Sequence, residues 1–122
     1  MSRHIDFFHA LSNEIRLRIL LLLLEEPRLS VCQLVRILGL PQPKVSRHLA
    51  ALRDAGVASI DRRAQWVCYG LGETLQPWQR RVLEEVRESL RDTAQYRADM
   101  NMLRRVREMA RNHPCQPAPR AA

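Results

Sequence analysis

The chain has 122 residues, of which 46% are hydrophobic and 27% are charged, and this composition excludes a disordered protein and predicts one globular domain. The formal net charge of +7 indicates a polyanionic partner. The longest aliphatic run, residues 19–24, is far shorter than the roughly 20 residues of a membrane-spanning helix. Because the N-terminus also lacks the pattern of a signal peptide, we expect a cytoplasmic protein with reduced cysteines.

The first 27 residues predict two helices. Residues 5, 8 and 11 are apolar and lie at helical spacing, which gives a short first helix. Ser12 or Asn13 then offers an N-cap for a second helix that runs to about Glu26, where Pro27 ends it. The second half of this helix is apolar nearly all round, so we expect it to be buried on more than one side.

A helix-turn-helix is predicted between residues 30 and 56. Ser30 begins the first of its two helices with a capping box, because the Gln33 side chain can bond back to the Ser30 backbone. Gly39 ends that helix, and Pro43 fits the first turn of the second helix, which Gly56 closes. The second helix is predicted to have one apolar stripe that faces the core. It is formed by Val45, Leu49 and Leu52, which are spaced at i, i+4 and i+7.

The opposite face of this second helix is basic at its start and low in its middle. Lys44 and Arg47 lie there, with Ser46 to one side and His48 on the border with the apolar stripe. Two alanines follow at positions 50 and 51, where a solvated helix usually carries long charged side chains. The pattern suits a helix that enters the major groove of DNA with its N-terminal end first. An ordinary amphipathic helix is the alternative.

Two strands are predicted after this helix, over residues 57–60 and 66–71, because both segments are rich in β-branched and aromatic residues. Residues 61–65 between them are predicted to form a hairpin tip. Arg62 and Arg63 in that tip would reach phosphates or the minor groove beside the site that the helix reads. A solvated turn is the alternative for these arginines.

From Pro77 onward we predict one long helix with an apolar stripe at residues 78, 82, 86 and 90, resumed at 100, 103, 106 and 109. Because this stripe is longer than a small domain can cover, we expect it to pack against a second copy, with the first helix beside it, in a homodimer. The fold class is mainly α with a small β-hairpin wing, a winged helix-turn-helix. Residues 1–112 form its DNA-binding and dimerisation domain, and residues 113–122 a disordered tail.

These segments together resemble the ArsR/SmtB family of winged-helix repressors. The resemblance covers residues 5 to about 90 and rests on residues 10–20 (ALSNEIRLRIL), 29–35 (LSVCQLV), 42–49 (QPKVSRHL) and 65–71 (QWVCYGL). The chain is most similar to the arsenite-responsive ArsR branch, whose recognition helix carries a very similar Gln-Pro-Lys-x-Ser-Arg-His-Leu run. The resemblance implies a homodimer that binds a palindromic double-stranded operator, represses transcription and is released by its inducer. It also implies DNA contacts from the helix and the wing: Gln42, Lys44, Ser46, Arg47, His48, Arg62, Arg63 and Gln65.

The segment that would bind the inducer departs from the arsenite-responsive branch. That branch looks like Cys-Val-Cys-x-Leu-Cys at the start of the third helix, since As(III) prefers two or three converging thiolates. Here Ser30 and Val35 stand where relatives carry cysteine, and Cys32 remains. A thiolate near a helix N-terminus can be reactive, so we expect As(III) as inducer, with Cys68 or Cys115 as further ligands, and no obligatory cofactor. Alternatively, Cys68 fills a gap in the sheet and Cys115 has no role.

Two other functions remain open. In the first, the DNA-binding dimer is a redox sensor in which Cys32 forms a disulfide or persulfide with Cys68 or Cys115. In the second, a winged-helix dimer binds other proteins and has no operator. Enzymatic activity is not expected, because the sequence has no glycine-rich phosphate loop, no recognisable Cys/His or Ser/His pair and no clustered carboxylates.

Overall fold

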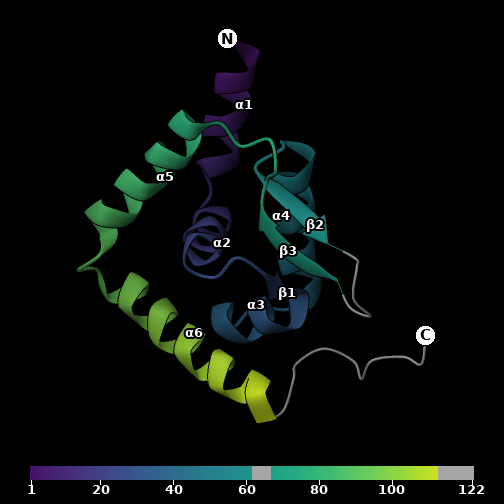
Figure 1. Cartoon of the computed structure of the whole chain (residues 1–122), viewed down its shortest axis with the longest axis vertical. Coiled ribbons are helices and arrows are strands. Elements are labelled where there is room, and N and C mark those ends of the chain that lie inside the picture. Colours follow the sequence, from purple (N-terminus) through teal and green to yellow (C-terminus); the bar gives the residue numbers. More distant parts are fainter. Residues whose placement is uncertain (62–66, 113–122) are drawn as a thin grey trace.

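The computed structural model describes residues 1–61 and 67–112, with side chains up to residue 109. In this part of the chain helices predominate, and α2 lies at the centre with the other helices and a small antiparallel sheet around it (Figure 1). None of these helices combines the length and the apolar character needed to cross a bilayer. The elements are α1 (Ser2–Leu11), α2 (Glu14–Glu25), β1 (Leu29–Ser30), α3 (Val31–Leu38), α4 (Gln42–Asp54), β2 (Ala58–Asp61), β3 (Cys68–Leu71), α5 (Pro77–Leu90) and α6 (Ala94–Asn112).

The centre of the hydrophobic core is α2. The side chain of Asn13 caps this helix by accepting hydrogen bonds from the backbone N–H groups of Ile15 and Arg16, at 2.9 and 3.1 Å, which confirms one of the two predicted caps. The second half of α2 is buried on several sides, as predicted, because α1, α4, α5, α6 and β3 all pack against the helix. Its fully buried side chains include Ile19, Leu20 and Leu22.

The two helices α3 and α4 form the predicted helix-turn-helix. At the start of α3 the Ser30 hydroxyl accepts the Gln33 backbone N–H, and the Gln33 side chain accepts the Ser30 backbone N–H, at 3.1 and 2.9 Å. Gly39 ends α3 in the left-handed conformation, with φ of 67°. After a short turn α4 packs on α2, α3 and β2, and its apolar stripe faces them.

The sheet has three antiparallel strands in the order β1-β3-β2 within the described residues. The predicted wing strands correspond to β2 and β3, but Asp61 continues β2 instead of lying in the hairpin tip. β1 was not predicted, because two residues are too few for an alternating pattern and its pairing depends on tertiary contacts. Leu29 lies opposite Tyr69, and Ser30 opposite Cys68. The base of the wing is therefore joined directly to the start of α3.

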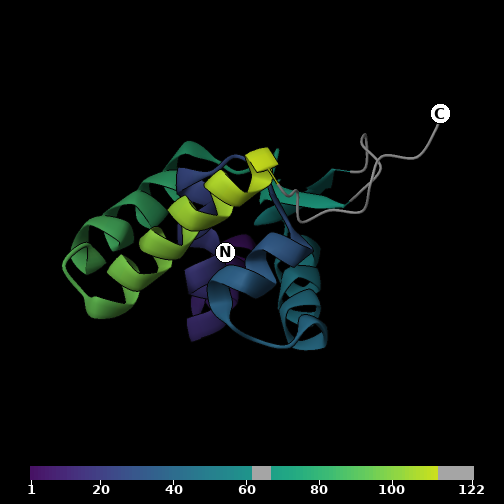
Figure 2. The same ribbon diagram turned by 90° about the horizontal axis from the view of Figure 1, so that it is seen from below.

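The prediction of one long C-terminal helix is wrong, because a turn separates α5 from α6. Thr93 makes this turn: its hydroxyl donates to the Leu90 carbonyl at 2.6 Å and accepts the Tyr96 backbone N–H at 3.3 Å, which caps α6. After the turn α6 runs back across α2 and α3 (Figures 1 and 2). Leu103 and Val106 of α6 are buried in their own subunit. This part of the stripe does not need a second copy to cover it.

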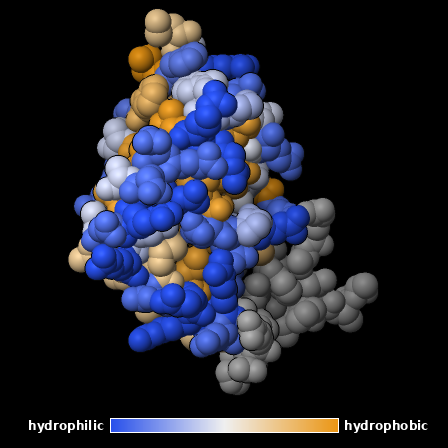
Figure 3. All heavy atoms as spheres, turned by 60° about the vertical axis from the view of Figure 1, so that its left-hand side comes forward, coloured by the Kyte–Doolittle hydropathy of each residue, from blue (hydrophilic) through white to orange (hydrophobic). Residues whose placement is uncertain are grey.

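The helix α1 forms as predicted, but of the apolar residues at positions 5, 8 and 11 only Leu11 packs against the core. Phe7 and Ala10 are in the core, and the Phe7 ring packs on Trp78 of α5 with 5.2 Å between ring centroids. Ile5 and Phe8 are 60% and 48% exposed. Apolar atoms accordingly gather at the N-terminal tip of the molecule (Figure 3). Together with Met1, Ile5 and Phe8 form an exposed apolar surface, called the α1 patch below.

Candidate nucleic-acid interface

A basic surface is held rigidly on the outer side of α4. The three stripe residues on its inner side, Val45, Leu49 and Leu52, are fully buried, which fixes the helix against the core. On the outer side Lys44 and Arg47 are exposed, one turn apart. The first turn of α4 contains no acidic residue. The N-terminal half of α4 therefore offers positive charge to a polyanion such as DNA.

The remaining predicted contact positions of α4 form a low surface beside these charges. Gln42 is exposed at the first position of the helix, and Ser46 is half-buried. Ala50 and Ala51 are half-buried and exposed, respectively, so that no long side chain stands over the middle of the helix. Another surface can approach the backbone of α4 closely here, as major-groove binding requires.

His48 lies at the edge of this surface and contacts a residue that the sequence analysis did not single out. It is half-buried, and its Nδ1 lies 3.5 Å from Nη1 of Arg16 on α2. Burial lowers the pKa of His48, and the positive charges of Arg16, Arg47 and Lys44 lower it further. The imidazole is therefore neutral at pH 7. The predicted position of His48, on the border between the buried and exposed faces of α4, is confirmed. Its ring both packs against α2 and reaches the surface of α4.

The predicted wing contacts Arg62, Arg63 and Gln65 lie outside the described residues, and their roles stay predictions. The base of the wing is described. There Asp61, the last residue of β2, forms an ion pair with Arg28, with 2.9 Å between Nη1 and Oδ2. This contact joins β2 to the segment between α2 and β1.

Two of the three cysteines lie near the start of α3. Cys32 is the second residue of α3 and is half-buried. Its sulfur is in a disulfide, so the expectation that all cysteines are reduced is wrong for this residue. Cys68 on β3 is half-buried as well, and it pairs with Ser30, two residues before Cys32. Cys115 lies outside the described residues. Within residues 1–61 and 67–112 no three His, Cys, Asp or Glu side chains come together as a metal site.

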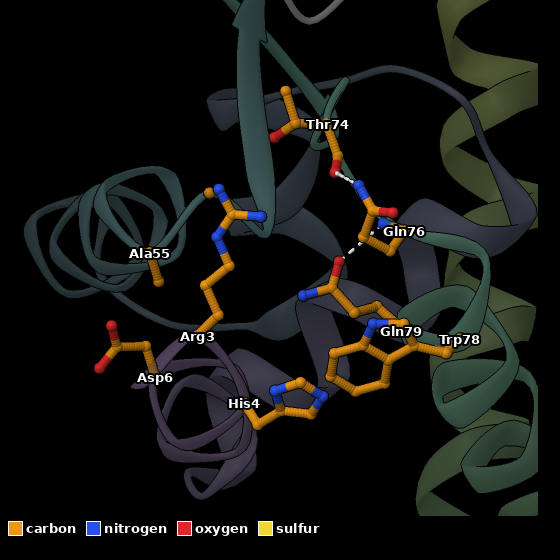
Figure 4. Close-up of a pocket in the computed structure, with 9 residues that line it drawn as sticks. Arg3, His4, Asp6, Ala55, Thr74, Gln76, Trp78 and Gln79 are labelled. Atoms are coloured by element: carbon orange, nitrogen blue, oxygen red, sulfur yellow. Dashed lines mark hydrogen bonds between the residues drawn. The ribbon is translucent and has the colours of Figure 1, made fainter. Parts of the chain in front are cut away.

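A separate cavity of about 550 Å³ lies between α1, the C-terminal end of α4 and the start of α5 (Figure 4). The His4 ring stacks on Trp78 at its wall, with 4.4 Å between centroids and 9° between ring planes. Gln76 and Gln79 form a capping box at the start of α5. Of the predicted DNA and inducer residues that the structure describes, none lines this cavity. Its contacts join α1 to α5 and are not part of the basic surface.

A helix-turn-helix with an exposed basic second helix, followed by an antiparallel wing, defines the class of winged helix-turn-helix DNA-binding proteins. Residues 13–59 match the family described as bacterial regulatory protein, arsR family. Together with the relatives described next, this match shows that the chain belongs to the ArsR family. It is therefore a DNA-binding transcriptional regulator.

Two regulators from Pseudomonas putida and one solved structure show the extent of the similarity. The chain is 42% identical over 99 residues to the arsenic resistance transcriptional regulator ArsR2, covering 81% of this chain and 83% of that protein. It is 43% identical over 79 residues to ArsR1, covering 65% of this chain and 62% of that protein. HlyU from Vibrio cholerae aligns with a TM-score of 0.64 and 34% identity, covering 71% of this chain and 90% of that chain.

Proposed function

We propose that this protein is a repressor that binds a palindromic double-stranded operator as a homodimer and is released by As(III). The observation that carries the proposal is the basic N-terminal half of α4, exposed on a helix whose inner face is fully buried. A helix held in this way can present side chains to base edges with little loss of conformational freedom.

The proposed DNA contacts come from two parts of the protein, the helix α4 and the wing. Lys44 and Arg47 suit phosphate oxygens or the N7 and O6 acceptors of guanine, and Gln42 suits adenine. Ser46 and His48 add polar groups beside them. The proposed wing contacts come from Arg62, Arg63 and Gln65, which would reach the DNA on either side of the bases that α4 reads.

The dimer is proposed to form through the α1 patch and the neighbouring surface of α5. Ile5 and Phe8 are apolar and exposed, and α1 is tied to the start of α5 by the rings of Phe7 and Trp78. Because α6 covers its own subunit, its buried residues are not included in the interface. Twofold symmetry would place the two α4 helices about one DNA turn apart, roughly 34 Å.

The proposed inducer site is built around Cys32 in its reduced form, with Cys68 or Cys115 as further thiolates. Two relatives are named arsenic resistance regulators. Cys32 lies in the helix that directly precedes α4, and α3 also packs against α6. A ligand that moves the first turn of α3 would therefore change the position of α4. A coupling free energy of about 1–3 kcal/mol between inducer binding and operator binding would be enough to lower operator occupancy several-fold.

A fluorescence-anisotropy titration tests this proposal on DNA from upstream of the protein's own gene, under reducing conditions. We expect arsenite to weaken operator binding by about 5- to 150-fold and Cys32→Ser to bind DNA normally but ignore arsenite. Cys68→Ser and Cys115→Ser then identify the remaining ligands, because replacing a cysteine that binds arsenite should weaken the arsenite response. An arsenite response that persists in Cys32→Ser would contradict a site at this cysteine.

The disulfide at Cys32 favours a thiol-redox sensor as the second candidate function. Forming such a bond removes two protons and two electrons from two thiols, and these must pass to an oxidant such as a peroxide or another disulfide. This function predicts operator binding that changes with dithiothreitol and peroxide, depends on Cys32 and does not respond to arsenite.

A further inference from the structure

Arg16 is a residue of α2 that contacts both α1 and α4. From the first turn of α2, its Nε donates to the carbonyl of Ala10 at 2.7 Å and its Nη2 to the carbonyl of His9 at 3.1 Å. Both carbonyls belong to the last turn of α1, where the helix dipole favours a positive charge. The third nitrogen, Nη1, faces Nδ1 of His48 on α4 at 3.5 Å. One side chain therefore connects the end of α1 to α4.

This contact determines which nitrogen of His48 carries the proton. A guanidinium group has only donors, so Nδ1 of His48 must accept and the proton of the neutral ring must be on Nε2. The charges of Arg16, Arg47 and Lys44, together with burial, disfavour a second proton on the ring. His48 is half-buried, so part of the ring remains at the surface of α4. The ring consequently has one donor, the Nε2–H group.

We propose that Arg16 is a positioning residue for operator recognition, which holds His48 as the Nε2–H tautomer and aligns α4 with the end of α1. An Nε2–H donor suits an acceptor on DNA, either a phosphate oxygen or the N7 or O6 of guanine. The inference rests on the proposed operator binding. It also gives a direct physical connection between α1, which carries the exposed patch of the proposed dimer, and the helix that contacts DNA.

The binding test compares Arg16→Met with Arg91→Met. Both variants lose one arginine, but Arg91 is exposed at the end of α5, away from α4. We expect Arg16→Met to weaken operator binding by about three- to tenfold and Arg91→Met to leave it unchanged. In a His48→Gln background the Arg16→Met change should have little further effect, because the two residues act through one contact. Equal effects in both backgrounds would overturn the proposal.

A nitrogen-15 NMR spectrum of the His48 ring gives a readout that a purely structural role of Arg16 would not change. In the unmodified protein Nε2 should carry the proton and Nδ1 should not, whereas Arg16→Met should show a mixture of both tautomers. If Arg16→Met does not fold, Arg16→Lys is used, since its single ammonium group cannot bond to α1 and His48 at once. An Nδ1–H tautomer in the unmodified protein would overturn the assignment.

These two measurements separate the failure of this inference from the failure of the proposed function. A protein that binds no operator but shows the Nε2–H tautomer lost in Arg16→Met would refute operator binding and keep the Arg16–His48 contact. Operator variants identify the acceptor. If His48→Gln weakens binding to all sequences equally, the acceptor is a phosphate, and if it relaxes the preference at one base pair, the acceptor is guanine.

Discussion

Replacing Lys44 and Arg47 with glutamate is expected to weaken operator binding at least about a hundredfold at near-physiological salt. Each subunit would lose two positive charges and gain two negative ones at the surface proposed to meet the phosphates and bases. Both side chains are exposed, so their replacement should leave the fold unchanged. Anisotropy titrations measure the affinity, and thermal unfolding followed by circular dichroism checks the fold.

The matched control is Arg104→Glu with Arg105→Glu. These residues are exposed neighbours on α6, and their reversal changes the net charge by the same amount. We expect only a small effect, because general electrostatic attraction is screened over about 8 Å at physiological salt. An equal loss in both double variants would show that total charge, and not α4, governs binding. Unchanged operator binding in Lys44→Glu/Arg47→Glu would exclude α4 as the contact surface.

Asp99→Asn is expected to lower the free energy of unfolding by about 2–4 kcal/mol. Asp99 is 5% exposed and accepts two hydrogen bonds from Arg18, at 3.0 and 2.9 Å, and one from Gln95 at 3.0 Å. The contact with Arg18 joins α6 to α2. Asparagine would remove the charge and one acceptor, leaving the guanidinium of Arg18 largely buried without its counterion. Urea unfolding measures the change.

Asp92→Asn is the control for this prediction. Asp92 also pairs with an arginine, Arg97, at 3.3 Å, but its side chain is 91% exposed. Ion pairs in water contribute little, so the expected change is within about 0.5 kcal/mol. Similar losses in Asp92→Asn and Asp99→Asn would contradict the importance of the buried contact between α2 and α6.

The parts of the fold that could be predicted from sequence are those determined by local signals. The capping box of Ser30 and Gln33 and the left-handed Gly39 depend on neighbours within a few residues, and the structure contains all of them. The stripe of α4 was also predictable, because a helix with a single apolar face has only one way to bury it. These local signals were sufficient to define the helix-turn-helix and its basic surface.

The errors came from contacts between residues far apart in sequence. Residues around Thr93 look like a polar turn of a continuing helix, and the reversal at this point depends on α6 packing against α2 and α3. Strand β1 exists because Leu29 and Ser30 meet β3 about 40 residues later. On α1, two apolar faces were available, and the ring of Trp78 selects the one that contains Phe7.

Part of the candidate site was hidden for the same reason. The exposure of Lys44 and Arg47 followed from helical projection and is observed. Arg16, in contrast, is one of several arginines on α2 or near its ends, and nothing in its immediate sequence distinguishes it. Its partner His48 is 32 residues away. The available signal was the position of Arg16, a basic residue shortly after the C-terminal end of α1, where it can bond to the last carbonyls of that helix.

The most direct test of operator recognition by α4 compares two DNA duplexes of equal length, one from upstream of the gene and one with the same bases in scrambled order. At physiological salt the protein should bind the upstream duplex at least about a thousandfold more tightly than the scrambled one. Lys44→Glu/Arg47→Glu should abolish this difference. Equal affinity of the unmodified protein for both duplexes, at every upstream segment tested, would contradict operator recognition.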